Sequence, residues 1–391
     1  MYFSKRVSSI QPSATLTINA KAQEMRAQGE NVISLAAGEP DFPTPDHIVQ
    51  SAKQALDEDF TKYTAVPGIP ELRQAVADYF SENYHIQCRE QDVMVSNGGK
   101  QCLYNLLQAL VDPGDEVLIP SPYWVSYPAF AQLAEAVPVI VNTDPDTNFL
   151  VHKEKLEKSL TSKTKVLILN TPSNPTGCHY NQQALDELAE WAVSKNIFVI
   201  CDEMYDQLVY PPAEPASLCS FWSRHPDMIA VVNGLSKTFS MTGWRVGFVL
   251  AHPELIKAMS KIQGQSTSNV CSFVQKASVT ALRSSFEEVS RMRESFARRR
   301  DLVMDIISSW PQVECPRPDG GFYVFPRVDS YYNKDMDSSN KLCQAILEEE
   351  KVALVPGEAF GDDRCLRISY PVSDEILKDS LNRIGNFLAR I

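Results

Sequence analysis

The sequence lacks the features by which membrane proteins, secreted disulfide-bonded proteins and zinc proteins are usually recognised. No stretch approaches about 18 consecutive apolar residues, so no membrane-spanning helix is expected. The first 20 residues have neither a continuous apolar core nor a cleavage pattern, so no signal peptide is expected. The nine cysteines are scattered, without a CxxC pair or a histidine-rich neighbour. This pattern suits reduced thiols in the cytoplasm and predicts no metal site.

Basic charge is also scarce. Lysine and arginine number 37 against 49 aspartates and glutamates, which gives a net charge of −12 at pH 7. Such a chain is a poor partner for nucleic acid or an anionic membrane, although a local cluster of cations can still bind a small anion. With 44% hydrophobic residues in a chain of 391, a large core and a second, smaller domain are both possible. We therefore expect a small-molecule partner.

Short apolar runs alternate with amphipathic stretches from about residue 90 onward. The runs are rich in Val, Ile and Leu and lie at 115–120, 165–170, 197–203, 228–234 and 245–251. Near-continuous apolar strands of this kind predict a mostly parallel sheet that is covered on both faces. Helical spacing at 99–111 and 181–196 supplies two of the covering helices. The pattern predicts an α/β fold with a large domain over residues 46–282.

The two ends of the chain differ from this pattern. Residues 283–391 open with a long charged helix, continue with short strands and close on a helix, which predicts a smaller α+β domain. Residues 1–45 hold one predicted helix and a segment rich in proline and glycine, and they are too short to be a domain. We expect them to join the small domain and to reach a dimer partner. The run ARRRD at 297–301 is predicted to be a solvated helix face.

Polar residues follow three of the predicted strands. These are TPSNPTG at 171–177, CDEMY at 201–205 and LSKTFS at 235–240. Each has an ordinary explanation when taken alone: a turn for the first, a helix cap for Asp202, and a solvent-exposed side chain for Lys237. Because parallel sheets bind ligands at the carboxyl ends of their strands, their joint position instead favours a shared site.

A lysine amine at a sheet edge is suited to Schiff-base chemistry with a carbonyl. If that carbonyl belongs to pyridoxal phosphate, an acid must pair with the pyridine nitrogen; Asp202 is favoured, with Glu203 as a second choice. The phosphate needs backbone N–H groups at a helix N-terminus and a cation. NGGK at 97–100 and Arg245 offer these, although a glycine pair alone often marks only a turn.

The motifs SNPTG, DEMY, SKTFSMTGWRVG and LRISY resemble those of class I aminotransferases, the fold-type I enzymes that depend on pyridoxal phosphate. The resemblance covers nearly the whole chain, through PSATLTINAKA, AGEPDFPTP, KYTAVPGIPELR, NGGKQ and SPYWVSYP. It is closest to the gamma subgroup of bacterial and plastid-type aspartate and prephenate aminotransferases. It implies the aspartate aminotransferase-like fold, with a large cofactor-binding domain and a smaller α+β domain.

The resemblance also implies residue roles. Lys237 would form the Schiff base and shuttle the substrate proton, and Asp202 would pair with the pyridine nitrogen. Asn174 and Tyr205 would hydrogen-bond the phenolic oxygen of the cofactor. Trp124 would stack on the ring, where packing in the core is the ordinary alternative.

The phosphate site implied by the resemblance consists of Gly98, Gly99, Ser236 and Arg245. Tyr63 from another subunit would complete it, where an aromatic packed beside a turn is the alternative. This arrangement implies a homodimer with shared active sites.

Substrate contacts follow from the same resemblance. Arg367 would grip the α-carboxylate in a bidentate fork, and Gly38 would let the N-terminal segment approach closely. Lys100 would bind a second carboxylate, assisted by the hydroxyls of Ser13 and Thr15; a solvated lysine is the alternative. Trp124 and Asn174 also belong to the implied substrate site.

These observations predict transamination between L-aspartate and 2-oxoglutarate, giving oxaloacetate and L-glutamate by a ping-pong mechanism between pyridoxal and pyridoxamine phosphate. Prephenate or an aromatic amino acid is the alternative substrate, since prephenate also carries two carboxylates. A pyridoxal-phosphate-dependent β-lyase would share Lys237, Asp202 and Arg367, but Lys100 argues against it. A nicotinamide-dependent oxidoreductase lacks its GxGxxG signature here, and a cofactor-binding DNA regulator lacks room and basic charge.

Overall fold

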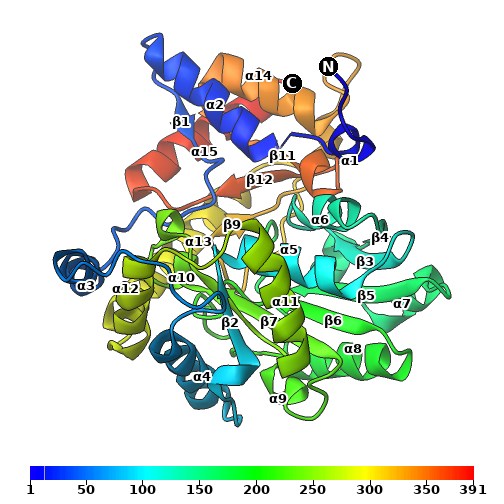
Figure 1. Ribbon diagram of the computed structural model, residues 1–391. Helices are drawn as coiled ribbons and strands as arrows, with labels where there is room; N and C mark the ends of the chain where they lie inside the picture. Colours follow the sequence, from blue (N-terminus) through cyan, green and yellow to red (C-terminus); the bar gives the residue numbers. More distant parts are fainter. Residues whose placement is uncertain (13) are drawn as a thin grey trace.

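The computed structural model describes residues 1–12 and 14–391, and its centre is a seven-stranded sheet (Figure 1). Its strands in spatial order are β2 (Val93–Ser96), β8 (Gly247–Leu250), β7 (Ile229–Gly234), β6 (Phe198–Asp202), β5 (Thr164–Asn170), β3 (Glu116–Ser121) and β4 (Val137–Asn142). Only β8 runs antiparallel to its two neighbours, β2 and β7. The remaining pairs are parallel, which confirms the predicted mostly parallel sheet.

The strands alternate their side chains between two hydrophobic layers, as a two-residue period requires. On β6, Val199 and Cys201 pack against helices α4 (Pro70–Tyr84) and α8 (Gln182–Ser194). Phe198 and Ile200 of the same strand pack on the opposite face, against α5 (Gly99–Leu110), α6 (Tyr127–Leu133) and α11 (Pro253–Ser266). Both faces are therefore covered, and the sheet exposes its functional groups only where the strands end.

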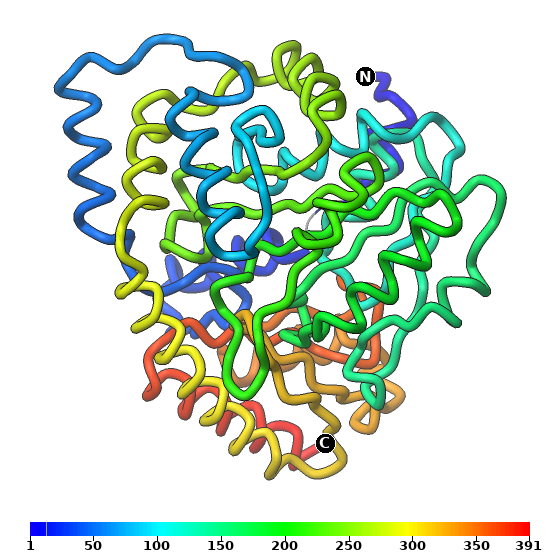
Figure 2. Tube along the Cα trace, turned by 90° about the horizontal axis from the view of Figure 1, so that it is seen from below, coloured from blue at the N-terminus to red at the C-terminus, as the bar shows by residue number. Residues whose placement is uncertain are grey.

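A smaller unit, at the top of Figure 1, contains two short sheets. The strands β9 (Tyr323–Val324), β12 (Leu366–Ser369) and β11 (Val355–Pro356) form an antiparallel sheet, and β1 (Ile33–Ser34) pairs in parallel with β10 (Val352–Ala353). The helices around them are α2 (Ala14–Ala27), α13 (Glu287–Ile307), α14 (Ser339–Glu350) and α15 (Asp374–Leu388). Figure 2 shows α13 and α15, in yellow and red, side by side. The N-terminal strand β1 thus joins the C-terminal part of the chain.

The prediction of a solvated face at 297–301 is wrong for two of its arginines. Arg299 and Arg300 on α13 are buried. Arg299 donates to both carboxylate oxygens of Asp41, at 2.7 and 2.9 Å, and Arg300 donates to the carbonyl of Pro318 at 3.2 Å. The N-terminal segment crosses α13 at this point and supplies the acidic partner, which the local sequence around the arginines does not reveal.

The remaining helices connect or cover these units. They are α1 (Lys5–Ser9), α3 (Asp46–Asp57), α7 (Lys153–Ser159), α9 (Cys219–Trp222), α10 (Leu235–Thr238) and α12 (Ser272–Arg283), with 3₁₀ turns at 90–92, 145–147, 242–244, 329–331 and 357–360. Across residues 1–12 and 14–391, no helix combines the length and apolarity needed to cross a bilayer.

Candidate active site

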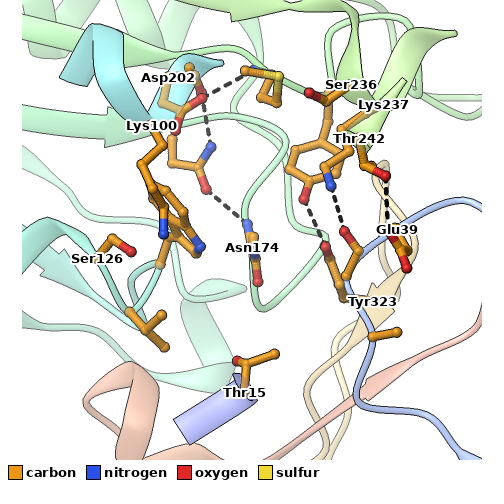
Figure 3. A pocket seen from close by; sticks show the side chains of 18 of the residues that line it. Thr15, Glu39, Lys100, Ser126, Asn174, Asp202, Ser236, Lys237, Thr242 and Tyr323 are labelled. Atoms are coloured by element: carbon orange, nitrogen blue, oxygen red, sulfur yellow. Dashed lines mark hydrogen bonds between the residues drawn. The ribbon is translucent and has the colours of Figure 1, made fainter. Parts of the chain in front are cut away.

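A cavity of about 430 Å³ opens at the carboxyl ends of β5, β6 and β7 (Figure 3). Its volume is that of a site for a small ligand or cofactor. Twelve of the residues proposed from the sequence line it: Thr15, Gly38, Gly99, Lys100, Trp124, Asn174, Asp202, Tyr205, Ser236, Lys237, Arg245 and Arg367. They come from both units of the structure and from the N-terminal segment, so the cavity lies where these parts meet.

Lys237 enters the cavity from α10, directly after β7. Its Nζ donates to the carbonyl oxygen of Gly38 at 2.5 Å. The pKa of the amine is lowered to about 8: burial is the main cause, the carboxylates of Glu39 and Asp202 oppose it, and the charges of Arg367 and Arg245 add to it. A useful fraction of the amine is therefore neutral near physiological pH, as a nucleophile requires.

Asp202 is the last residue of β6, and its carboxylate is buried. One oxygen accepts from the hydroxyl of Tyr127 at 2.7 Å, and the other accepts from the backbone N–H of Met204 at 3.2 Å. Burial raises the pKa of Asp202 to about 6, against the opposing effect of the Tyr127 hydrogen bond. The group is mostly ionised at neutral pH, and a cation placed against it would be strongly favoured.

Arg367 on β12 is only 2% exposed. Its Nη1 donates to the side-chain oxygen of Asn174 at 3.0 Å, and its Nη2 donates to the carbonyl of Ala36 at 2.7 Å. Its Nε is buried without a partner among the described residues. The guanidinium lies 4.7 Å from the ring centre of Tyr323 and 4.9 Å from that of Phe360. A buried cation with a free donor, held between two rings, is suited to bind a carboxylate.

The start of α5 packs against Arg245 in a way that only glycine allows. Gly98 has φ +83°, and a Cβ atom there would lie 2.5 Å from Nη2 of Arg245. Arg245 itself donates to the carbonyl of Thr242 at 2.9 Å, and Ser236 lines the adjacent wall. Backbone N–H groups at a helix start, a hydroxyl and a guanidinium form a donor set that fits a phosphate group.

Lys100, in the first turn of α5, lies with its Nζ 5.0 Å from the ring centre of Trp124. Burial, followed by the charge of Arg245, lowers the pKa of its amine. Trp124 packs edge-on against Tyr127 and Phe130, with ring centres 5.5 and 5.9 Å apart, and its other side lines the cavity. Lys100 is exposed in the single chain, but its side chain lines the cavity and its amine lies against the Trp124 ring.

Tyr205, Tyr63 and Ser13 differ in where they lie relative to the cavity. Tyr205 lines the cavity and shares a hydrogen bond of 2.8 Å with the hydroxyl of Tyr323. Tyr63 is 92% exposed and does not line the cavity of its own chain. Its assignment to the site of a second copy stays a prediction. Ser13 lies outside the described residues.

The sequence reasoning missed three side chains of this site. Tyr127 binds Asp202, Tyr323 binds Tyr205, and Glu39 binds the hydroxyl of Thr242 at 2.8 Å. Tyr127 and Glu39 stand inside motifs that were recognised, so their position beside assigned residues was an available signal. Tyr323 belongs to β9 in the smaller unit and is brought to the site only by tertiary packing.

Comparisons with known proteins agree with this geometry. Residues 30–384 match the family described as aminotransferase class I and II. The chain is 42% identical over 392 residues to the aspartate aminotransferase of Streptomyces avermitilis, covering 99% of this chain and 96% of that one. It is also 42% identical to the aspartate/prephenate aminotransferase of Cereibacter sphaeroides, with 99% of each chain covered.

Solved structures give the same result. The aspartate aminotransferase of Thermus thermophilus with maleate superposes with a TM-score of 0.92 at 39% identity, over 99% of both chains. The predicted α/β fold and the predicted family are both confirmed. The chain therefore belongs to the class I and II aminotransferases, enzymes that depend on pyridoxal 5′-phosphate.

Proposed function

We propose that this enzyme transfers the amino group between L-aspartate and 2-oxoglutarate, giving oxaloacetate and L-glutamate. The observation that carries the proposal is that two cations from different elements, Lys100 on α5 and Arg367 on β12, line one cavity. A dicarboxylic substrate needs both. The Thermus thermophilus relative, whose solved structure contains the dicarboxylate maleate, supports this choice.

The cofactor, when bound, supplies the electron sink that acidifies the substrate Cα–H bond. In this proposal Lys237 holds the cofactor and, once released, carries the proton at Cα. Asp202 keeps the pyridine nitrogen protonated, while Asn174 and Tyr205 bind the phenolic oxygen. Trp124 lies against the ring. The support is the convergence of these groups on the cavity together with the raised pKa of Asp202 and the lowered pKa of Lys237.

The phosphate would be held by Gly98, Gly99, Ser236 and Arg245, with Tyr63 of a second copy. The high exposure of Tyr63 in a single chain supports a homodimer with shared sites. We further propose that residues 1–45 form an N-terminal segment, residues 46–282 the large domain and residues 283–391 the small domain. A cytoplasmic location is a separate part of the proposal.

The substrate would bind with its α-carboxylate on Arg367 and Asn174, close to Gly38. Its distal carboxylate would be bound by Lys100, with Thr15 and, beyond the described residues, Ser13. In the structure Arg367 donates to the carbonyl of Ala36. A substrate carboxylate would therefore also engage Nε, which has no partner in the described part of the chain.

Prephenate is the second candidate substrate. The Cereibacter sphaeroides relative is named an aspartate/prephenate aminotransferase. Because prephenate carries two carboxylates, the pair of Lys100 and Arg367 suits it as well as aspartate. An aromatic amino acid lacks the second anion and would leave Lys100 without a role.

Half-reactions followed by absorbance test the proposal. Aspartate and glutamate should each convert the pyridoxal form of the cofactor into the pyridoxamine form, and prephenate, as an oxo acid, should convert the pyridoxamine form back. No spectral response to aspartate would refute the leading choice, and a response to prephenate would add the second. Lys100→Ala should raise KM for aspartate at least about tenfold and leave alanine unchanged, since a hydrogen bond to a charged group contributes about 1.5–3 kcal/mol.

The matched control is Lys153→Ala, which removes an exposed lysine on α7. It should change neither KM. An equal effect of Lys100→Ala on aspartate and on alanine would show that Lys100 is structural.

A further inference from the structure

The segment 36–44, here called the strap, crosses the mouth of the cavity between the two units. Toward the smaller unit, Arg367 donates to the carbonyl of Ala36. Toward the large sheet, Lys237 donates to the carbonyl of Gly38, and the hydroxyl of Thr44 donates to the carbonyl of Ser240 at 2.8 Å. The strap is therefore held directly over the reactive amine.

Glu39 is the strap residue next to the carbonyl that binds Lys237. Its Oε2 accepts from the hydroxyl of Thr242 at 2.8 Å, and Figure 3 shows this bond on the Lys237 side of the cavity. The carbonyl of Thr242 accepts from Arg245 in turn. Thr242 thus binds the Glu39 carboxylate through its hydroxyl and the Arg245 guanidinium through its backbone carbonyl.

The Glu39 carboxylate lies among an excess of cationic side chains in the cavity. Of the described residues that line the cavity, four are cationic (Lys100, Lys237, Arg245 and Arg367) and two are acidic (Glu39 and Asp202). The charged groups that act on Lys237 are Glu39 from the strap, Arg367 from β12, Arg245 from the loop after α10, and Asp202 from β6. After burial, which lowers the pKa of Lys237, Glu39 has the largest effect and it raises that pKa.

We propose that Glu39 is a positioning residue of the active site, anchored by Thr242, whose negative charge favours the protonated form of the free Lys237 amine and so partly offsets the effect of burial. This inference rests on the proposed role of Lys237 as the site of cofactor attachment. The charge matters in two steps: it slows attachment at low pH and it strengthens the released amine as the base that takes the Cα proton.

The rate at which pyridoxal phosphate attaches to Lys237 reports the effect of the Glu39 charge on the amine. The neutral amine nitrogen of Lys237 forms a double bond to the aldehyde carbon of pyridoxal phosphate, the carbonyl oxygen leaves as water, and the two amine protons leave with it. An ammonium has no lone pair for this reaction, so the rate follows the neutral fraction of the amine. Glu39 lies at the exposed mouth, so solvent weakens its charge.

The experiment measures attachment of pyridoxal phosphate to cofactor-free protein from pH 6 to 10, without substrate. Borohydride reduction traps the product, and mass spectrometry quantifies the pyridoxyl group on Lys237. In Glu39→Gln, which keeps an oxygen acceptor for Thr242 but removes the charge, the rate midpoint should fall by about half a pH unit. At pH 7 attachment should then be about threefold faster. The shift should shrink in about 1 M salt, where the screening length is about 3 Å.

Three further variants complete the test. Glu187→Gln removes one exposed carboxylate on α8 and should leave the midpoint unchanged. Thr242→Val removes the anchor of Glu39 and should lower the midpoint in part, whereas Thr242→Ser should restore it. Free pyridoxal, which lacks the phosphate, should show the same shift, since the effect does not involve Arg245.

An unchanged midpoint in Glu39→Gln, or an equal shift in Glu187→Gln, would overturn the inference. Failure of the wild-type protein to attach pyridoxal phosphate at Lys237 would instead refute the proposed function. The two failures are therefore distinguishable.

Discussion

Replacing Asp202 by asparagine should stabilise the cofactor-free protein while weakening cofactor binding. Burial raises the pKa of Asp202 from 3.8 to about 6. A shift of about two pH units corresponds to about 3 kcal/mol, which the ionised carboxylate costs the folded state at neutral pH. Asparagine removes this cost but can replace only one of the two acceptor oxygens, which bind Tyr127 and Met204. One lost hydrogen bond of about 1 kcal/mol leaves a net gain of about 2 kcal/mol.

The direction of the pKa shift determines how the stability cost of Asp202 changes with pH. The folded-state pKa of this acid lies above its unfolded value, so the cost is fully present above about pH 6 and disappears as pH falls through 3.8. At pH 5 about half of it remains, and the gain from Asp202→Asn should fall to about 0.5 kcal/mol.

Urea unfolding of the two cofactor-free proteins at pH 7.5 and pH 5, at one protein concentration, measures the difference. Asp227→Asn, at an exposed position, is the matched control and should change nothing. A loss of stability at pH 7.5, or a gain that does not depend on pH, would refute the argument that burial penalises this carboxylate. Titration with pyridoxal phosphate at pH 7.5 should show weaker binding to Asp202→Asn.

Two other substitutions test the phosphate cradle and the strap. Gly98→Ala places a Cβ atom 2.5 Å from Nη2 of Arg245 and should weaken pyridoxal phosphate binding about tenfold. The control Gly114→Ala, with a similar positive φ but no atom within 4 Å, should leave the affinity unchanged. Equal affinities of the two variants would contradict the proposed phosphate site at Gly98 and Arg245. Asp41→Asn removes the nearer of the two charged partners of Arg299, whose side chain is 10% exposed, and leaves Asp374 at 3.6 Å from Nε. It should lower the free energy of unfolding by about 2 kcal/mol in urea titrations; an unchanged value would show that the Asp41–Arg299 pair adds nothing.

The strand ends were predictable from the sequence because a local rule decides them. A buried parallel strand that ends in a polar residue places that residue at the ligand edge, and this rule identified Asp202 and Lys237 without any knowledge of tertiary structure. Glycine pairs and single arginines carry no such rule. Gly98 and Arg245 were candidates for a phosphate site as a glycine pair at a helix start and a nearby cation, and the resemblance to a family was needed to assign them.

The partners of the site residues were not predictable in the same way. Tyr323 reaches Tyr205 across 118 positions of the chain, and Asp41 neutralises Arg299 across 258. Nothing in the composition around Arg299 distinguishes a solvated arginine from one that a distant carboxylate covers. Burial and pairing of charge are decided by which segments cross, and that is tertiary information.

The strap also bears on how this protein is made. Gly38 and Ala36 leave the ribosome early, yet their partners Lys237 and Arg367 lie 199 and 331 residues further along. Strand β1 likewise cannot pair until β10 has been synthesised. Closing such long loops is slow and entropically costly, and Ala36 can meet Arg367 only after residue 367 has been synthesised. A growing chain therefore cannot close this cavity before both Lys237 and Arg367 have been made, and a chain truncated before residue 367 lacks the Ala36–Arg367 contact.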